Sequence, residues 1–238
     1  GEDCFRNCDV VDMTFACIGA VDAMHTTLDW VARSNDDDER LGIVIFSDNY
    51  QTISTYELNS GKFISSNGGS WNLKGNLMSE TVEFDTENNE RVGDKIEFEI
   101  KLRENELSIV GSDMIFKRID SGKPGKLQGA WLMSGRVRDG KKQLRDVNRP
   151  RKTMKILSGT RFQWIAYNIE TKQFMGTGGG TYTTINGEYK ESIDFFSRDD
   201  SKAGIVLKFD FDIINGEWNH QGFSSKGDPL HEIWIKRN

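Results

Sequence analysis

This chain of 238 residues has very little of several residue types, and each shortage excludes a class of protein. Three prolines beside 24 glycines exclude a collagen-like or proline-rich low-complexity chain. No apolar run approaches the ~20 residues of a transmembrane helix. Histidine is scarce, and neither His220 nor His231 stands near a nucleophile motif. We therefore expect a protein without catalytic residues that is not an enzyme.

Cysteine is confined to the first 17 residues, at Cys4, Cys8 and Cys17. A zinc site needs four ligands, and no second Cys or His pair follows, so we predict no metal and no cofactor. One disulfide plus one free thiol is expected if the compartment is oxidising. The chain begins at Gly1 without a Met or a basic–apolar leader, so we expect that a signal segment has been removed.

The most informative feature present is an internal repeat. Residues 45–109 recur in altered form at 156–220, with a constant offset of 111 and identical pairs such as Gly68/Gly179 and Glu80/Glu191. A register held without a gap for that length indicates one small fold used twice. We place two domains at residues 1–120 and 121–238, joined by a Gly- and Pro-containing linker at 120–126.

Short strands dominate both halves. Residues 95–102 and 208–213 alternate apolar and charged side chains, which is typical of an antiparallel sheet with one wetted face. Asn-Gly pairs at 186–187 and 215–216 predict hairpin turns. The sequence therefore predicts an all-β protein of two tandem antiparallel up-and-down β-barrels. A short amphipathic helix is expected over residues 10–24.

The second half also carries a recognisable motif. Gly129-Ala130-Trp131 on its first strand, with Arg237 after its last, resembles the lipocalin and wider calycin pattern. Residues 176–196 are similar to small lipocalin-like domains of secreted and envelope proteins from gut bacteria, which have no assigned activity. The resemblance implies that Trp131 closes the barrel floor under Arg237. It also implies a secreted, periplasmic or outer-membrane-anchored bacterial protein.

Each half places one glutamate among inward-facing apolar residues, Glu80 and Glu191. A carboxylate inside a barrel is unfavourable unless it is paired or neutralised. Two interpretations stay open: Glu191 anchors the head group of a ligand, or it forms an internal pair with an arginine such as Arg161, or lies at a wetted mouth.

Large aromatic side chains in the second half either line a cavity or fill the barrel. The run 162–169 is apolar on both faces, so its aromatic residues have no assigned side. The first half has smaller equivalents. The candidate ligand-binding residues are Glu191, Tyr189, Tyr182, Phe195, Phe209, Phe211, Trp218, Trp164 and Tyr167.

A basic stretch, residues 136–155, contains nine Lys and Arg against two Asp. The net charge is −13 over residues 1–120 and +7 over 121–238, so we expect complementary charge between the two domains. The stretch either covers the barrel mouth as a flap that attracts anions, or docks on acidic residues such as 36–39. The candidate anion-binding residues are Arg138, Lys141, Lys142, Arg145, Arg149, Arg151 and Lys152.

The leading hypothesis is a non-enzymatic module that binds a small, partly apolar, anionic ligand in the second barrel. The alternative is a structural or interaction protein of the cell envelope with filled barrels, which binds a protein or glycan by its surface. A nucleic-acid partner is not expected, because the chain is acidic overall and the basic stretch has few aromatic residues. The glycine run 176–180 lacks a Walker lysine and a following helix, which favours a backbone bulge over a phosphate loop.

Overall fold

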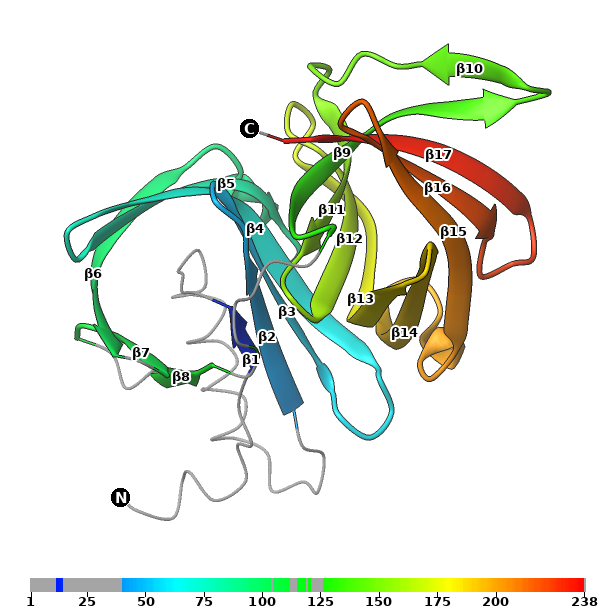
Figure 1. Cartoon of the computed structure of the whole chain (residues 1–238). Helices are drawn as coiled ribbons and strands as arrows, with labels where there is room; N and C mark the ends of the chain where they lie inside the picture. The colour runs from blue at the N-terminus through cyan, green and yellow to red at the C-terminus, as the bar shows by residue number, and fades with distance from the viewer. Residues whose placement is uncertain are drawn as a thin grey trace.

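The computed structural model describes residues 12–14, 40–103, 105–111, 115–118, 120 and 126–237. These residues form two curved sheets that lie side by side (Figure 1). One sheet closes into an eight-stranded antiparallel barrel, and the other curls into a half-barrel. The predicted all-β fold of tandem lipocalin-like barrels is therefore confirmed.

The first repeat is an eight-stranded sheet in which each strand pairs with the next along the chain. The prediction of a helix is wrong at Asp12–Thr14, because these residues form a strand that runs parallel to the neighbouring strand. The rest of the segment 10–24 lies outside the described residues. Pairing with a neighbouring strand overrides a weak local helix preference. The elements are β1 (Asp12–Thr14), β2 (Arg40–Phe46), β3 (Tyr50–Glu57), β4 (Phe63–Lys74), β5 (Leu77–Asp85), η2 (Asn89–Arg91, a 3-10 turn), β6 (Lys95–Arg103), β7 (Glu106–Ile109) and β8 (Ile115–Lys117).

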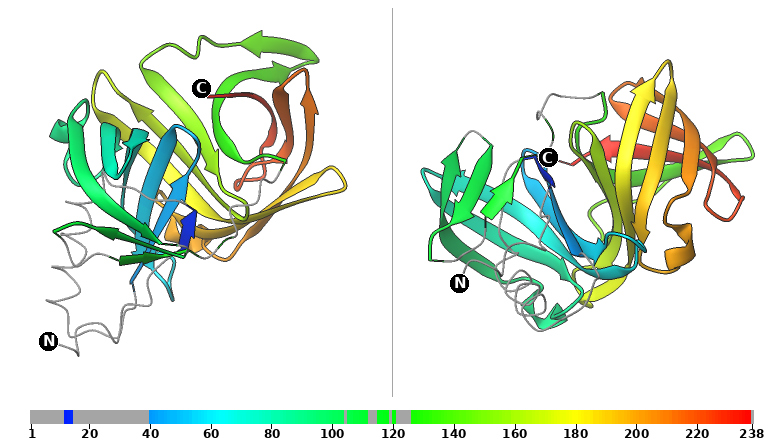
Figure 2. Two further views of the ribbon diagram at one scale, coloured as in Figure 1. Left: turned by 60° about the vertical axis from the view of Figure 1, so that its left-hand side comes forward. Right: turned by 90° about the horizontal axis from the view of Figure 1, so that it is seen from below.

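The second repeat is a closed barrel, because its last strand returns to pair with its first. Figure 2 shows this sheet curling round on itself. One short strand pairs only with the first strand and extends it as a hairpin. The elements are β9 (Gly129–Arg138), β10 (Lys141–Leu144), β11 (Arg151–Leu157), β12 (Arg161–Asn168), β13 (Gln173–Ile185), β14 (Glu188–Phe196), η3 (Asp200–Lys202), β15 (Val206–Ile214), β16 (Glu217–Phe223) and β17 (Pro229–Lys236).

The two repeats share irregularities as well as strands. The pairing of β4 with β5 shifts just before Gly69, and that of β13 with β14 shifts just before Gly180. A Cβ atom on Gly69 would lie 1.9 Å from the Thr81 carbonyl oxygen, and one on Gly180 would lie 2.0 Å from that of Ser192. Such close strand approach requires glycine. The glycine run of the second half therefore faces a bulge in β14 and permits close strand approach, and it is not a phosphate loop, as predicted.

The outer faces of the two sheets pack against each other around a shared apolar core. β2 contributes Ile43 and Ile45 to this core, and β11 contributes their equivalents Met154 and Ile156. A charge pair also crosses between the repeats, from Arg237 to Glu83 at 2.8 Å. Apolar packing therefore joins the repeats in the described structure. The acidic run 36–39 lies outside the described residues.

Aromatic rings close one end of the second barrel. Trp131 packs edge-on against Trp218, with ring centroids 5.6 Å apart. The prediction that Arg237 covers Trp131 is wrong. The Lys236 Nζ lies there instead, 4.5 Å from the Trp131 ring centroid. The guanidinium of Arg237 lies 3.9 Å from the ring centroid of Tyr50 in the first repeat. Because neighbouring residues of a strand point to opposite faces, only one of the two can cover the floor.

Candidate ligand-binding cavity

The closed barrel contains a cavity of about 730 Å³ that opens at the end opposite Trp131. This volume lies within the ~300–1,000 Å³ typical of small-molecule sites. Its walls come from β9 and six further strands of the barrel, and they carry both apolar and polar side chains. The apolar and aromatic lining residues include Met133, Ile193, Leu207, Phe209, Leu230 and Trp234.

A buried ion pair lies on the inner wall. The Lys155 Nζ on β11 is 2.6 Å from Glu191 Oε1 on β14, and both side chains are almost fully buried. The interpretation that Glu191 pairs with Arg161 is wrong. Arg161 pairs with Asp194 at 2.8 Å, and Asp194 lies on the face of β14 that meets the first repeat. Since the two acids lie on opposite faces of β14, an arginine that bonds one cannot reach the other.

Aromatic rings surround the Lys155 ammonium. Its Nζ lies 5.0 Å from the ring centroid of Tyr189, 5.1 Å from that of Trp218 and 5.5 Å from that of Trp234. Ring faces attract cations, which helps to accommodate the charge that Glu191 neutralises. Burial, together with the nearby charge of Glu191, raises the pKa of Tyr189 well above its ordinary value. The phenol therefore stays protonated at neutral pH.

Further polar groups lie between this pair and the mouth. His220 Nδ1 is 3.6 Å from Glu232 Oε2, and Arg136 Nη2 is 3.5 Å from Glu232 Oε1. Burial, and then the charge of Lys155, lower the pKa of His220 to about 4. The imidazole is therefore neutral at pH 7 and has one donor and one acceptor nitrogen.

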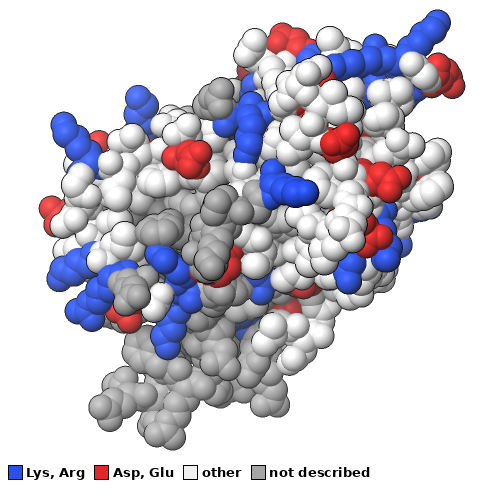
Figure 3. All heavy atoms as spheres, viewed as in Figure 1, with Lys and Arg blue, Asp and Glu red and all other residues white. Residues whose placement is uncertain are grey.

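Arginines surround the mouth of the cavity. Burial and the charges of Arg149, Arg151 and Arg136 lower the pKa of Arg145, because these cations crowd one another. Figure 3 shows Lys and Arg side chains along the β9–β10 hairpin, at the upper right. The acidic lining residues are Glu191 and Glu232, each beside a basic partner. The arginines at the mouth are Arg136, Arg138, Arg145, Arg149, Arg151 and Arg198.

The basic stretch is mostly strand, not a flap. It forms the end of β9, all of β10 and the start of β11. Some of its cations do not line the cavity: Lys142 pairs with Glu217 at 2.6 Å, and Lys152 donates to the Val147 carbonyl at 2.7 Å. Lys141 is exposed on β10. The hairpin therefore extends the barrel wall, and part of the stretch supplies the arginines of the mouth.

The predicted lining residues separate into three groups. Glu191, Trp164 and Phe209 line the cavity. A second group belongs to the aromatic cluster of the barrel interior, outside the cavity lining: Tyr182, Tyr189, Phe211 and Trp218.

The third group, Phe195 and Tyr167, faces the first repeat, so the prediction that they line the cavity is wrong. Phe195 stacks on Tyr56 with ring centroids 4.9 Å apart, and Tyr167 packs against Phe84 at 5.2 Å. Strict alternation along β14 places Phe195 inside the barrel. The bulge after Ile193 inserts one residue and reverses that alternation.

Sequence reasoning missed Lys155, Arg136 and Arg198 as site residues. A signal for Lys155 is present in β11, where Thr153 and Lys155 alternate with apolar residues. That pattern puts a lysine on the same face as the cavity residues, but it does not reveal the partner across the barrel.

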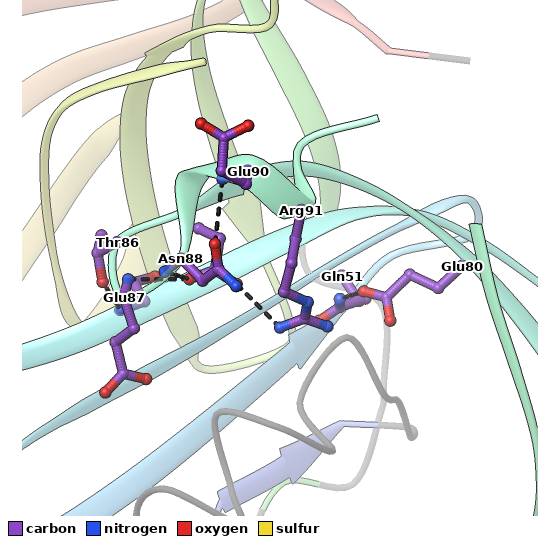
Figure 4. Close-up of polar contacts among 9 residues, drawn as sticks. Gln51, Glu80, Thr86, Glu87, Asn88, Glu90 and Arg91 are labelled. Atoms are coloured by element: carbon purple, nitrogen blue, oxygen red, sulfur yellow. Dashed lines mark hydrogen bonds and ion pairs between the residues drawn. The ribbon is translucent and has the colours of Figure 1, made fainter. Parts of the chain in front are cut away.

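The first repeat treats its inner glutamate differently. Val44 stands at the position of Lys155, so Glu80 has no equivalent lysine. The Gln51 amide donates to the Glu80 carboxyl instead, and Figure 4 shows these two side chains pointing toward each other. Burial raises the pKa of Glu80 to about 8. In Figure 4 Arg91 of η2 extends towards the same sheet; it pairs with Asp85 at 2.9 Å.

Comparisons with known proteins find similar solved structures but no family. No family model matches the chain, and no curated protein matches it. Among solved structures, a lipocalin-like protein from Bacteroides uniformis matches at 16% identity with a TM-score of 0.33, covering 48% of this chain and all of that one. In the described part of the chain, no helix could span a membrane, and no cluster of His, Cys, Asp and Glu could hold a metal ion.

Proposed function

We propose that the protein is a non-enzymatic binding module that holds a small, partly apolar, anionic molecule in the closed barrel of the second repeat. The observation that carries the proposal is a cavity with aromatic and aliphatic side chains in its interior and six arginines at its mouth. Apolar walls favour a chain or ring inside the barrel, and guanidinium groups favour a carboxylate, sulfate or phosphate. An anionic amphiphile with its head at the mouth satisfies both.

The crowding of the arginines supports the same conclusion. The charges of Arg149, Arg151 and Arg136 disfavour protonation of Arg145, and a bound anion relieves that repulsion. Lys155 and Glu191 neutralise each other on the inner wall, so the surplus positive charge lies at the mouth. The affinity for an anionic ligand is therefore expected to fall as salt screens these partly exposed charges.

Calorimetric titration with dodecanoate and with uncharged dodecanol, at low and high salt, tests this function. The double variant Arg145→Ser/Arg149→Ser is expected to weaken dodecanoate binding by about tenfold or more and to leave dodecanol binding unchanged. Arg103→Ser is the matched control, because that side chain is 80% exposed on the first repeat. Equal binding of acid and alcohol, without salt dependence, would overturn the proposal.

A second candidate function is supported by the first repeat. An apolar cluster that includes Val44, Met78 and Leu107 packs against the inner face of its curled sheet. Such a domain suits a structural or interaction role in which a protein or glycan binds the surface. Native mass spectrometry distinguishes the candidates: a small molecule that co-purifies and leaves on denaturation favours the cavity function, and its absence favours the surface role.

The proposed setting is the envelope or exterior of a bacterial cell. The likeness of residues 176–196 to secreted and envelope lipocalin-like domains supports this setting. Fractionation of the native host, with a cytosolic marker as control, tests it. Recovery with the cytosolic marker would contradict it.

A further inference from the structure

Several buried polar atoms inside the second barrel have no hydrogen-bond partner among the described residues. They are Trp218 Nε1, Trp234 Nε1 and both ring nitrogens of His220. Glu232 Oε2 is 3.6 Å from His220 Nδ1, which is too long for a hydrogen bond. Buried donors and acceptors in folded proteins are almost always satisfied, so a cluster of unsatisfied ones indicates a bound group or ordered water.

These atoms belong to one place in the fold. The rings of Tyr189, Trp218 and Trp234 all lie within 5.5 Å of the Lys155 Nζ, and the rings of Trp218 and His220 are 5.3 Å apart. His220 and Trp234 also line the cavity, together with the arginines of the mouth. Polar groups therefore extend from the arginines of the mouth, through Glu232, to an inner end formed by His220 and Trp234.

The charges around His220 and Trp234 determine which chemical group of a ligand can bind there. Lys155 is neutralised by Glu191 at 2.6 Å, and Glu232 lies beside Arg136 at 3.5 Å. His220 is neutral, because burial lowers its pKa to about 4. The unsatisfied groups are N–H donors, with one acceptor nitrogen on the imidazole. A neutral oxygen meets these needs, whereas a second carboxylate would approach Glu191 and Glu232.

We propose that the ligand of the second repeat carries, at the end opposite its anionic head, a hydroxyl or ketone oxygen that hydrogen-bonds to His220 and Trp234. This inference rests on the proposed function and names the ligand class of the same cavity: ω-oxygenated anionic amphiphiles. In a purely apolar barrel an added hydroxyl weakens binding, because it loses water without gaining a partner. In a barrel that hydrogen-bonds it, the plain chain is the poorer ligand, because the polar groups stay unpaired.

Competitive titration of the full chain with dodecanoate, ω-hydroxydodecanoate and dodecanedioate tests the inference. The wild type is expected to prefer the hydroxy acid to dodecanoate by about tenfold or more. His220→Phe and Trp234→Phe keep a ring at each position and remove the hydrogen-bonding nitrogen. Each is expected to abolish most of this preference, measured within each variant as the ratio of its affinities for the hydroxy acid and for dodecanoate. Dodecanedioate is expected to bind more weakly than the hydroxy acid.

The outcomes separate this inference from the proposed function. Equal binding of dodecanoate and the hydroxy acid overturns the inner site and leaves the arginine-dependent function standing. A preference for the hydroxy acid that survives in both variants also overturns it. Tighter binding of the diacid overturns the assignment of a neutral oxygen. No binding of any of the three acids overturns both proposals. Thermal denaturation shows whether each variant is folded. If one of the two variants does not fold, the other variant alone tests the inference.

Discussion

Phe63 and Phe174, which occupy the same position in the two repeats, stack on each other with ring centroids 6.2 Å apart and planes 7° from parallel. A residue meets its own equivalent only near an axis that relates the two copies. Two neighbouring ring contacts exchange partners across this axis: Tyr56 with Phe195 at 4.9 Å, and Tyr167 with Phe84 at 5.2 Å. The repeats thus pack as the subunits of a two-fold dimer do, within one chain.

The same relation supplies a matched pair of variants. Glu83 accepts a hydrogen bond from Tyr167 at 2.5 Å and pairs with Arg237 at 2.8 Å, with 14% of its side chain exposed. Its equivalent, Asp194, accepts one from Tyr56 at 3.3 Å and is 31% exposed. We expect Glu83→Ala to lower the free energy of unfolding by ~3 kcal/mol, because it leaves a buried guanidinium unpaired. Asp194→Ala should lower it by ~1 kcal/mol. Urea denaturation measures both, and equal losses would contradict the difference in burial.

The Lys155–Glu191 pair predicts a non-additive effect on stability. Glu191→Leu leaves the Lys155 ammonium buried without its counter-ion, which should lower the free energy of unfolding by ~3–5 kcal/mol. Adding Lys155→Met replaces the charge with an apolar chain of similar length, so the double variant is expected to recover most of the loss. Chemical denaturation of the two single variants and the double variant measures the coupling. Additive losses would show that the two charges do not compensate each other.

Glu80 predicts a dependence of stability on pH. Its pKa is about 8 in the folded protein because of burial, against an ordinary value of 4.5. Between these values the unfolded chain has released a proton that the folded chain retains. The stabilising contribution is therefore full below pH 4.5 and is lost as the pH rises through about 8. Glu80→Gln should remove this fall in the free energy of unfolding. Glu97→Gln, on the exposed face of β6, is the control and should leave the profile unchanged.

His220 predicts a dependence of stability on pH with the opposite sign, in which stability falls as the pH is lowered. Its pKa falls from the ordinary 6.5 to about 4 because of burial, so between these values the unfolded chain takes up a proton that the folded chain does not. Stability is therefore full above pH 6.5 and is lost as the pH falls through about 4. His220→Phe should flatten this part of the thermal-midpoint profile. An NMR titration in which the His220 imidazole shifts near its ordinary pKa would contradict the burial argument.

The sequence by itself determined the duplication and the fold class. The offset of 111 relates strands, turns and bulges of the two repeats because it reflects one backbone built twice. Alternation predicted the sheet, since side chains of a strand point alternately to its two faces. The Asn-Gly turns follow from local chemistry: Asn186 and Asn215 both adopt positive φ, at 50° and 52°.

The tertiary structure decided which side chains meet. Glu191 was placed inward by its strand pattern, but Lys155 as its partner depends on how β11 and β14 face each other across the closed barrel. Phe195 points outward because one bulge reverses the alternation, and a single inserted residue has no signal in side-chain pattern. Arg237 turns to Glu83 because the second repeat packs on the first. Local sequence determines the face of the sheet to which each strand residue points, whereas long-range packing determines which residue it contacts. The candidate site consists of residues that long-range packing brings together.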